Sequence, residues 1–364
     1  MNTSRIGVRL LAAIFSVCSM AIGTLAMANA ASIVVVASTV PSNGDVNPYG
    51  MAVVPATTGS LVAGDILISN FNDSNNLQGT GTTIMQISPD GRARLFAQID
   101  PSHLHGQCPG GVGLTTALAV SQSGWVFVGS LPTTDGKPDT ARAGCIIVLN
   151  SLGQVAETLY GSLINGPWDM TAFDGGNHIK LFVTNVLNGT VAGHGHVVNA
   201  GTVVRLDIAF ASGSNPRVTS MAVIASGLSE RTDPAALVIG PTGVGLSPDN
   251  SALYVADSLN NRIAAISNPL TRTMSDGIGA TVTMGGMLND PLGLALAPNG
   301  DILTVDGADG FLVRTTPHGN QIHEALLDSS GSPPGAGALF GLAVVPNRGL
   351  YFVDDATNTL NLFH

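Results

Sequence analysis

The chain has 364 residues, of which 10% are charged and 45 are glycine, and its formal net charge at pH 7 is −10. Clustered cations that could displace counterions from a nucleic acid are lacking, so nucleic-acid binding is not expected. The apolar content, 45% of residues, argues against a disordered protein.

The first 30 residues have the pattern of an export signal. Two arginines precede a mostly apolar stretch over 10–27, and Ala28-Asn29-Ala30 is a small-residue cleavage site. The alternative is an uncleaved anchor, because the apolar stretch is about long enough to span a bilayer. We expect cleavage after residue 30 and a periplasmic or secreted monomer, residues 31–364, with no later membrane span. Loss of two arginines leaves 12 basic and 24 acidic groups, a net charge of −12.

A repeated segment predicts the fold of the mature chain. "PTGVGLSPDNSALYVADSLNNRI" (241–263) matches segments at 291–312 and 339–360, and more divergent copies begin at 48, 116 and 167. Each copy has two short strands of alternating character joined by a tight turn such as "SPDN", "APNG" or "VPNR", in which Asn or Gly can adopt the left-handed conformation.

Two further strand-like runs follow the first pair in each repeat. The clearest pairs lie at 83–88 and 93–99, at 145–150 and 154–159, and at 201–208 and 218–225. Four strands in each of six repeats predict an all-β protein, a single six-bladed β-propeller. The last repeat ends one strand short, so we expect "SIVVVAS" (32–38) to close the last blade and remove an open edge.

The repeat at 241–263 resembles the NHL repeat, a proline-glycine strand followed by a strand ending in A-D-x-x-N-N-R. The resemblance implies the propeller fold but no single function, because such propellers include amidating lyases, gluconolactonase-like lactonases, strictosidine synthase-like enzymes, antibiotic lyases and binding modules.

The longest connections are expected on one face. In a propeller, the segments that enter each innermost strand and those that join second to third strands share a face, which we call the loop face. "SHLHGQCPGG" (102–111) and the segment 186–201 both belong to it. Cys108 and Cys145 would also lie there, and in an oxidising compartment we expect them to form a disulfide. A metal-ligand role is the weaker alternative, because neither belongs to a C-x-x-C.

Two histidine pairs on this face are candidate ligands for zinc or copper: His103, His105, His194 and His196. The alternative is that they are solvated loop residues. NHL-type amidating lyases use a three-histidine zinc site, but with ligands taken singly from separate blades.

The ends of the second strands form a second candidate site. Five polar residues occupy this position: Asn70, Asn185, Asp257, Asp306 and Asp354. The lactonase resemblance implies calcium held by axial Glu, Asn and Asp side chains, although this chain has no Glu near the start of its first innermost strand. Otherwise these residues cap their own turns.

The third candidate lies at the mouth of the central channel. Trp168 and Asp169 replace small residues of the repeat, and Tyr49 and Phe340 stand at the position of Trp168 in their blades. They could bind a small apolar or sugar-like ligand, with Asp169 as an acid or base, or could simply plug the channel. We expect a propeller that binds a small molecule or protein on its loop face. The alternative is a metal-assisted lyase or lactonase-type hydrolase.

Overall fold

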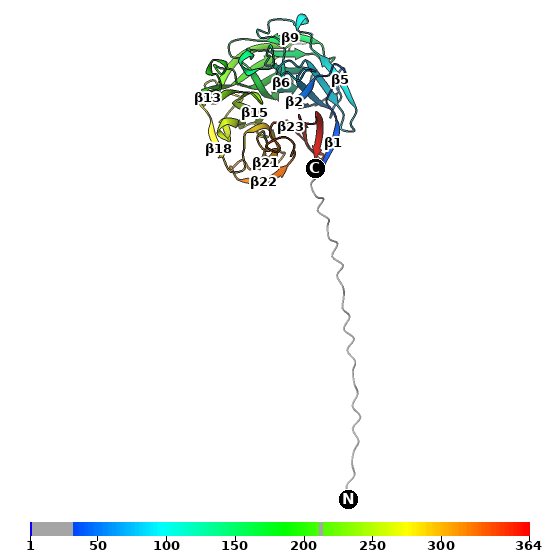
Figure 1. The fold of residues 1–364 in the computed structure, drawn as a ribbon, viewed down its shortest axis with the longest axis vertical. Coiled ribbons are helices and arrows are strands. Elements are labelled where there is room, and N and C mark those ends of the chain that lie inside the picture. Colours follow the sequence, from blue (N-terminus) through cyan, green and yellow to red (C-terminus); the bar gives the residue numbers. More distant parts are fainter. Residues whose placement is uncertain (2–31, 211–213) are drawn as a thin grey trace. The chain divides into compact units, whose positions relative to one another are not determined.

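The computed structural model describes Met1, residues 32–210 and residues 214–364, and residues Ser32–His364 form one compact unit. The predicted signal therefore lies outside the described residues, except for Met1. Within the described ranges, no helix is long and apolar enough to cross a bilayer. Six antiparallel sheets surround a common axis, which confirms the six-bladed propeller (Figure 1).

The first three blades follow the chain order from the innermost strand outward. Blade one contains β2 (Val46–Val53), β3 (Ile66–Asn72), β4 (Thr83–Ile87) and β5 (Ala93–Gln98). Blade two contains β6 (Leu114–Val120), β7 (Val126–Ser130), β8 (Ile146–Leu149) and β9 (Val155–Leu159). Blade three contains β10 (Pro167–Asp174), β11 (His178–Asn185), β12 (Val198–Ala209), β13 (Arg217–Asp233) and β14 (Leu237–Ile239).

The remaining blades repeat the pattern. Blade four contains β15 (Pro241–Leu246), β16 (Ala252–Asp257), β17 (Arg262–Ser267) and β18 (Ala280–Met284). Blade five contains β19 (Pro291–Leu296), β20 (Ile302–Asp306), β21 (Phe311–Thr315) and β22 (Gln321–Leu326). Blade six contains β23 (Leu339–Val345), β24 (Gly349–Asp354), β25 (Thr359–Phe363) and β1 (Ile33–Ser38). In Figure 1, β2, β6, β15 and β23 lie near the centre, and β5, β9, β13, β18 and β22 lie at the rim.

The N-terminal strand closes the ring as the sequence predicts. β1 pairs with β25, with Ile33 opposite Phe363. The Ser32 amide donates to the His364 carbonyl at 2.8 Å, and the His364 amide donates back at 3.1 Å. The first and last segments of the compact unit thus share one blade, which links the ring by backbone hydrogen bonds.

The tight turns between first and second strands also follow the prediction. Asn250, Gly300 and Asn347 have φ values of 61°, 88° and 63°, the left-handed region that Asn and Gly tolerate. These turns form the face opposite the loop face, which we call the turn face.

Blade three departs from the prediction. β13 continues beyond 225 to Asp233, turns at 234–236 and pairs with the additional strand β14, with Thr232 opposite Val238. The turn "PAA" contains neither Gly nor Asn, but Asp233 precedes it and accepts the N–H groups of Ala235 and Ala236, as in an Asx turn. We call residues 233–239 the strap, because they extend from the rim of blade three toward other blades. The Gln78 side-chain amide of blade one donates to the Pro234 carbonyl at 3.0 Å.

Candidate functional site

The loop-face end of the axis is filled by aromatic rings. We call Tyr49, Phe71, Trp168 and Phe340 the aromatic plug, and each is at most 2% exposed. The Tyr49 ring stacks on Phe340 at a centroid distance of 3.8 Å and on Phe71 at 4.5 Å, and Trp168 lies 6.4 Å away, tilted. Ring faces in contact give large apolar burial with defined geometry.

The strap covers the plug. Leu237, Val238 and Ile239 are buried in the same apolar cluster as the plug, and the indole N–H of Trp168 donates to the Val238 carbonyl at 3.1 Å. Leu237 has φ 62°, a conformation that costs a non-glycine residue energy and persists where surrounding contacts enforce it. Three of the four residues predicted to bind ligand, Tyr49, Trp168 and Phe340, therefore form a packed layer under the strap, and their contact with a ligand stays a prediction.

A cavity of about 330 Å³ begins next to the plug and follows the innermost strands toward the turn face. Its lining continues along all six innermost strands, through Ala52, Val120, Ala172, Leu246, Leu296 and Val344. Glycines at its inner end allow the innermost strands to lie close together. A Cβ atom at Gly341 would lie 2.2 Å from the Tyr49 carbonyl oxygen of the next blade, so glycine there allows the strands to approach closely.

Asp169 occupies the equivalent narrow level in blade three and lines the cavity. Its Oδ1 accepts the Met170 N–H at 2.8 Å, and its Oδ2 accepts the Val244 N–H of the next blade at 3.0 Å. Burial raises the pKa of this carboxyl to about 7, although the two N–H bonds oppose the shift. Of the cavity-lining residues found in 32–210 and 214–364, Asp169 is the one with an ionisable side chain. Such a group can hold or release a proton near neutral pH.

The residues at the second-strand ends make both local and longer-range bonds. The Asn185 side-chain oxygen accepts the Asn165 N–H at 2.8 Å, Asp354 accepts the Thr357 N–H at 3.1 Å, and Asn70 donates to the Thr39 carbonyl at 3.1 Å. Asp354 thus caps its own turn, as the alternative predicts, whereas Asn185 and Asn70 bond to segments 20 and 31 positions earlier in the chain.

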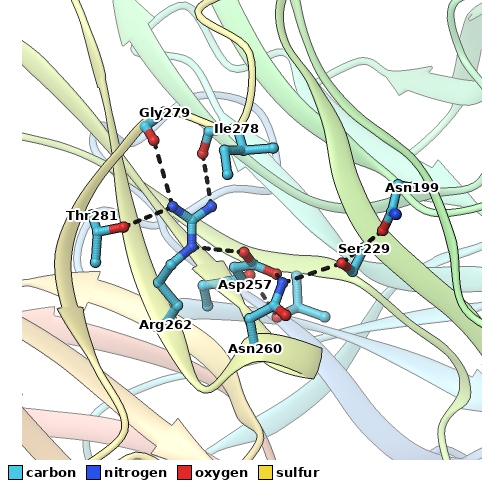
Figure 2. A network of polar contacts seen from close by, with 10 residues as sticks. Asn199, Ser229, Asp257, Asn260, Arg262, Ile278, Gly279 and Thr281 are labelled. Atoms are coloured by element: carbon cyan, nitrogen blue, oxygen red, sulfur yellow. Dashed lines mark hydrogen bonds and ion pairs between the residues drawn. The ribbon is translucent and has the colours of Figure 1, made fainter.

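Asp257 is neutralised within its own blade. Its carboxylate accepts from Arg262 Nε at 2.8 Å and from Asn260 at 2.9 Å (Figure 2). Arg262 also donates to the Ile278 carbonyl at 2.8 Å, so its charge is used inside blade four. A carboxylate already paired with an arginine is a poor starting point for a metal site.

Other carboxyl groups on the loop face lack such partners. Burial, and then repulsion from Asp233, raises the pKa of Asp290 to about 6, and burial, then repulsion from Asp354, raises that of Asp355 to about 7. Burial raises the pKa of Asp306 to about 8, and its Oδ1 has no hydrogen-bond partner in the described part of the chain. Sequence reasoning missed Asp290 and Asp355, because a single Asp in a turn carries no pattern.

The histidine pairs lie exposed on the loop face. His103 is bound to Asp100, with Nδ1 and Oδ2 2.7 Å apart, and the His105 backbone accepts from Thr158 on the outermost strand of blade two. His194 and His196 follow the short helix η3 (Val191–Gly193). Across the described residues, no group of three or more His, Cys, Asp or Glu side chains is placed to hold a metal ion. Zinc or copper binding by these histidines stays a prediction.

The predicted disulfide is present. Cys108 and Cys145 are bonded, with Cα atoms 5.1 Å apart and a sequence separation of 37. The bond links the segment that enters blade two to the start of its third strand.

A family model, the SMP-30/gluconolactonase/LRE-like region, matches residues 187–332, which run from the loop before β12 to the connection after β22. Among curated protein sequences, none matches this chain. The chain is similar to a gluconolactonase from Xanthomonas campestris, with a TM-score of 0.55 and 13% identity over 92% of this chain and 89% of that one.

Two other solved structures extend the comparison. A calcium-binding protein, regucalcin from Agrobacterium tumefaciens, gives a TM-score of 0.55 at 14% identity over 86% of this chain and 89% of that one. Virginiamycin B lyase from Staphylococcus aureus gives 0.52 at 14% identity over 92% and 99%. The NHL name is not confirmed by these matches. At these identities the likeness shows the fold, a propeller of the kind that these proteins share.

Proposed function

We propose that this chain is an exported six-bladed propeller that binds a small organic molecule in its central cavity, entering from the turn face. The cavity with Asp169 at its inner end is the observation that carries the proposal. Its volume, about 330 Å³, lies in the range of small-molecule pockets. A rigid ring of six sheets would hold such a pocket in one shape.

The walls offer backbone as well as side-chain contacts. β2, β6, β10, β15, β19 and β23 are each the end strand of their sheet, so their inner edges face the axis without a strand partner. Asp169 already uses one such group, the Val244 N–H. A ligand with polar atoms could bind to other backbone N–H and C=O groups on these inner edges, because backbone groups without a strand partner can still form hydrogen bonds.

A second candidate is a metal-assisted lactone hydrolase on the loop face. The family model and the names of the similar structures support it. The lactonase resemblance implies axial Glu, Asn and Asp ligands, whereas here the loop-face end of the axis holds the packed rings of Tyr49, Trp168 and Phe340. Asp306 Oδ1 is an unpartnered oxygen that suits calcium, but among the described residues no group of three or more His, Cys, Asp or Glu side chains is placed to hold a metal ion. The aromatic rings at this end of the axis argue against an axial calcium ion.

Export rests on two observations. Residues 1–30 have the signal pattern, and a disulfide is typical of proteins that fold in an oxidising compartment. Expression of the full chain in a bacterial host should yield a periplasmic or secreted product whose N-terminal sequence begins at Ala31. A cytoplasmic product that retains Met1 would contradict export.

The cavity is tested with three seven-carbon probes, heptylammonium, heptan-1-ol and heptanoate, measured by titration calorimetry. At least one should bind, and Thr171→Phe, which adds a ring at the cavity wall, should abolish binding. Thr219→Phe, the same change at an exposed site on β13, should leave binding intact. If no probe binds, or if Thr171→Phe binds as the unchanged chain does, the central cavity is not the site.

A further inference from the structure

We infer that the ligand of the central cavity is a small amine with an apolar body, whose ammonium group binds the Asp169 carboxylate. This inference rests on the proposed function and names the ligand class for the same site.

The Asp169 carboxylate has no cationic side chain beside it. None of the ion pairs within the described ranges includes Asp169, and no Lys, Arg or His lines the cavity there. A carboxylate in such a place is stabilised by N–H donors alone, and a cation that enters the cavity would supply the missing counter-charge. An anionic ligand would meet no cationic side chain in the cavity and would be repelled by the Asp169 carboxylate.

The Asp169 carboxylate can accept further hydrogen bonds. Two ionised carboxylate oxygens offer about four lone-pair positions. The Met170 and Val244 N–H groups use two of them, one on each oxygen. An ammonium group has three N–H donors and can take the remaining positions, which a carbonyl-bearing ligand cannot do while Asp169 is ionised.

The side chains along the cavity suit an apolar ligand body. Beyond Asp169 most of the side chains that line the cavity are apolar, among them Met51, Leu118, Leu294 and Leu342, and polar surface lies beside them. Two hydroxyl groups belong to the lining, and that of Thr116 already donates to the Trp168 carbonyl, whereas the other is that of Thr171. A hydrocarbon body of modest size could contact the apolar side chains while its charged end reaches Asp169.

Protonation gives the inference a distinct signature. Burial raises the pKa of Asp169 to about 7, and the lining residues in 32–210 and 214–364 include no other ionisable side chain that could mask its titration. The ionised fraction falls from about nine-tenths at pH 8 to about one-tenth at pH 6. An alkylammonium, with an ordinary pKa near 10, stays charged over this interval. Amine affinity should therefore fall about tenfold from pH 8 to pH 6.

The test compares heptylammonium with heptan-1-ol, its neutral isostere, by titration calorimetry. At pH 8 the amine should bind at least about tenfold more tightly than the alcohol, as expected for a hydrogen bond to a charged group. Asp169→Asn should remove this preference, and its thermal unfolding reports that it is folded. The control variant is Asp249→Asn, which removes a carboxylate from an exposed turn on the turn face. This variant should still bind the amine more tightly than the alcohol.

The outcomes separate the two proposals. Equal binding of alcohol and amine by the unchanged chain, tighter binding of heptanoate, or an amine preference that survives Asp169→Asn would overturn the amine inference while leaving the cavity as a binding site. Failure of all three probes to bind would overturn the proposed function as well.

Discussion

The two ends of the propeller axis are built from consecutive residues of the same strands but differ in filling. At the loop-face end, Tyr49, Trp168 and Phe340 form a packed aromatic layer beneath the strap. One residue further along each strand, Gly50, Asp169 and Gly341 stand where the layer ends and the cavity begins. The longest loops therefore lie at the closed end, so loop length alone does not locate the pocket of this protein.

The largest effect is expected from opening the closed end. Trp168→Ala should lower the free energy of unfolding by about 3–5 kcal/mol, because it removes a buried ring and its bond to Val238. Urea unfolding measures the change. Trp125→Ala, at a half-buried tryptophan near the turn face, is the matched control and should cost clearly less. Equal costs would mean that the plug is not a packed layer.

Removing the disulfide tests whether the stability of the loop-face rim and ligand binding in the central cavity are independent of each other. Replacing both Cys108 and Cys145 by Ala should cost about 3–4 kcal/mol, because the bond closes a segment with a sequence separation of 37. Probe binding in the cavity should persist, since neither cysteine lines it. Loss of probe binding in a variant that is still folded would show that the two regions are coupled.

Because of the buried carboxyl groups on the loop face, we predict that the free energy of unfolding falls as pH rises. Burial raises the pKa of Asp290, Asp355 and Asp306 to about 6, 7 and 8. A folded-state pKa above the ordinary value near 4 stabilises the fold below pH 4, and this contribution is lost as pH rises through 6 to 8. The free energy of unfolding should drop by several kcal/mol from pH 5 to pH 9.

Asp306→Asn should flatten that pH profile, because it removes the carboxyl with the highest pKa of the three. Asp249→Asn is the control, since hydrogen bonds from Ser247 and Ser251 lower the pKa of Asp249 to about 2. A stability that is constant or rises between pH 5 and pH 9 would contradict the assignment of buried, unpaired acids.

The smallest effect is expected at the histidine pairs. Because all four side chains are exposed, the double variant His103→Ala/His194→Ala should change the free energy of unfolding by less than about 0.5 kcal/mol without added metal. Metal analysis of protein purified without a histidine tag gives the complementary result. One equivalent of zinc or copper that disappears in the double variant would favour the metal-assisted enzyme instead.

The sequence predicts the frame of the molecule well. The repeat around Gly243, Gly293 and Gly341 fixes six blades because each copy must pack its faces against a neighbour. Asp169 was recognisable as a departure from the repeat, and its place in the cavity lining follows from that register.

The strap and the acidic groups could not be predicted in the same way. Strand β14 is three residues long, and the turn before it lacks the Gly or Asn of the repeat's hairpin turns. The raised pKa of Asp290 depends on burial and on Asp233, 57 positions earlier in the chain, so no local pattern encodes it. Which end of the axis is open depends on how rings from blades one, three and six pack together.

Amide chemical shifts test the central claim most directly. On titration with heptylammonium at pH 8, the cavity account predicts shifts concentrated at Gly245, Gly293 and Gly341, which line the cavity. Shifts concentrated instead at Gly189 and Gly195, in the loop that carries His194 and His196, would place the ligand on the loop face and contradict the account.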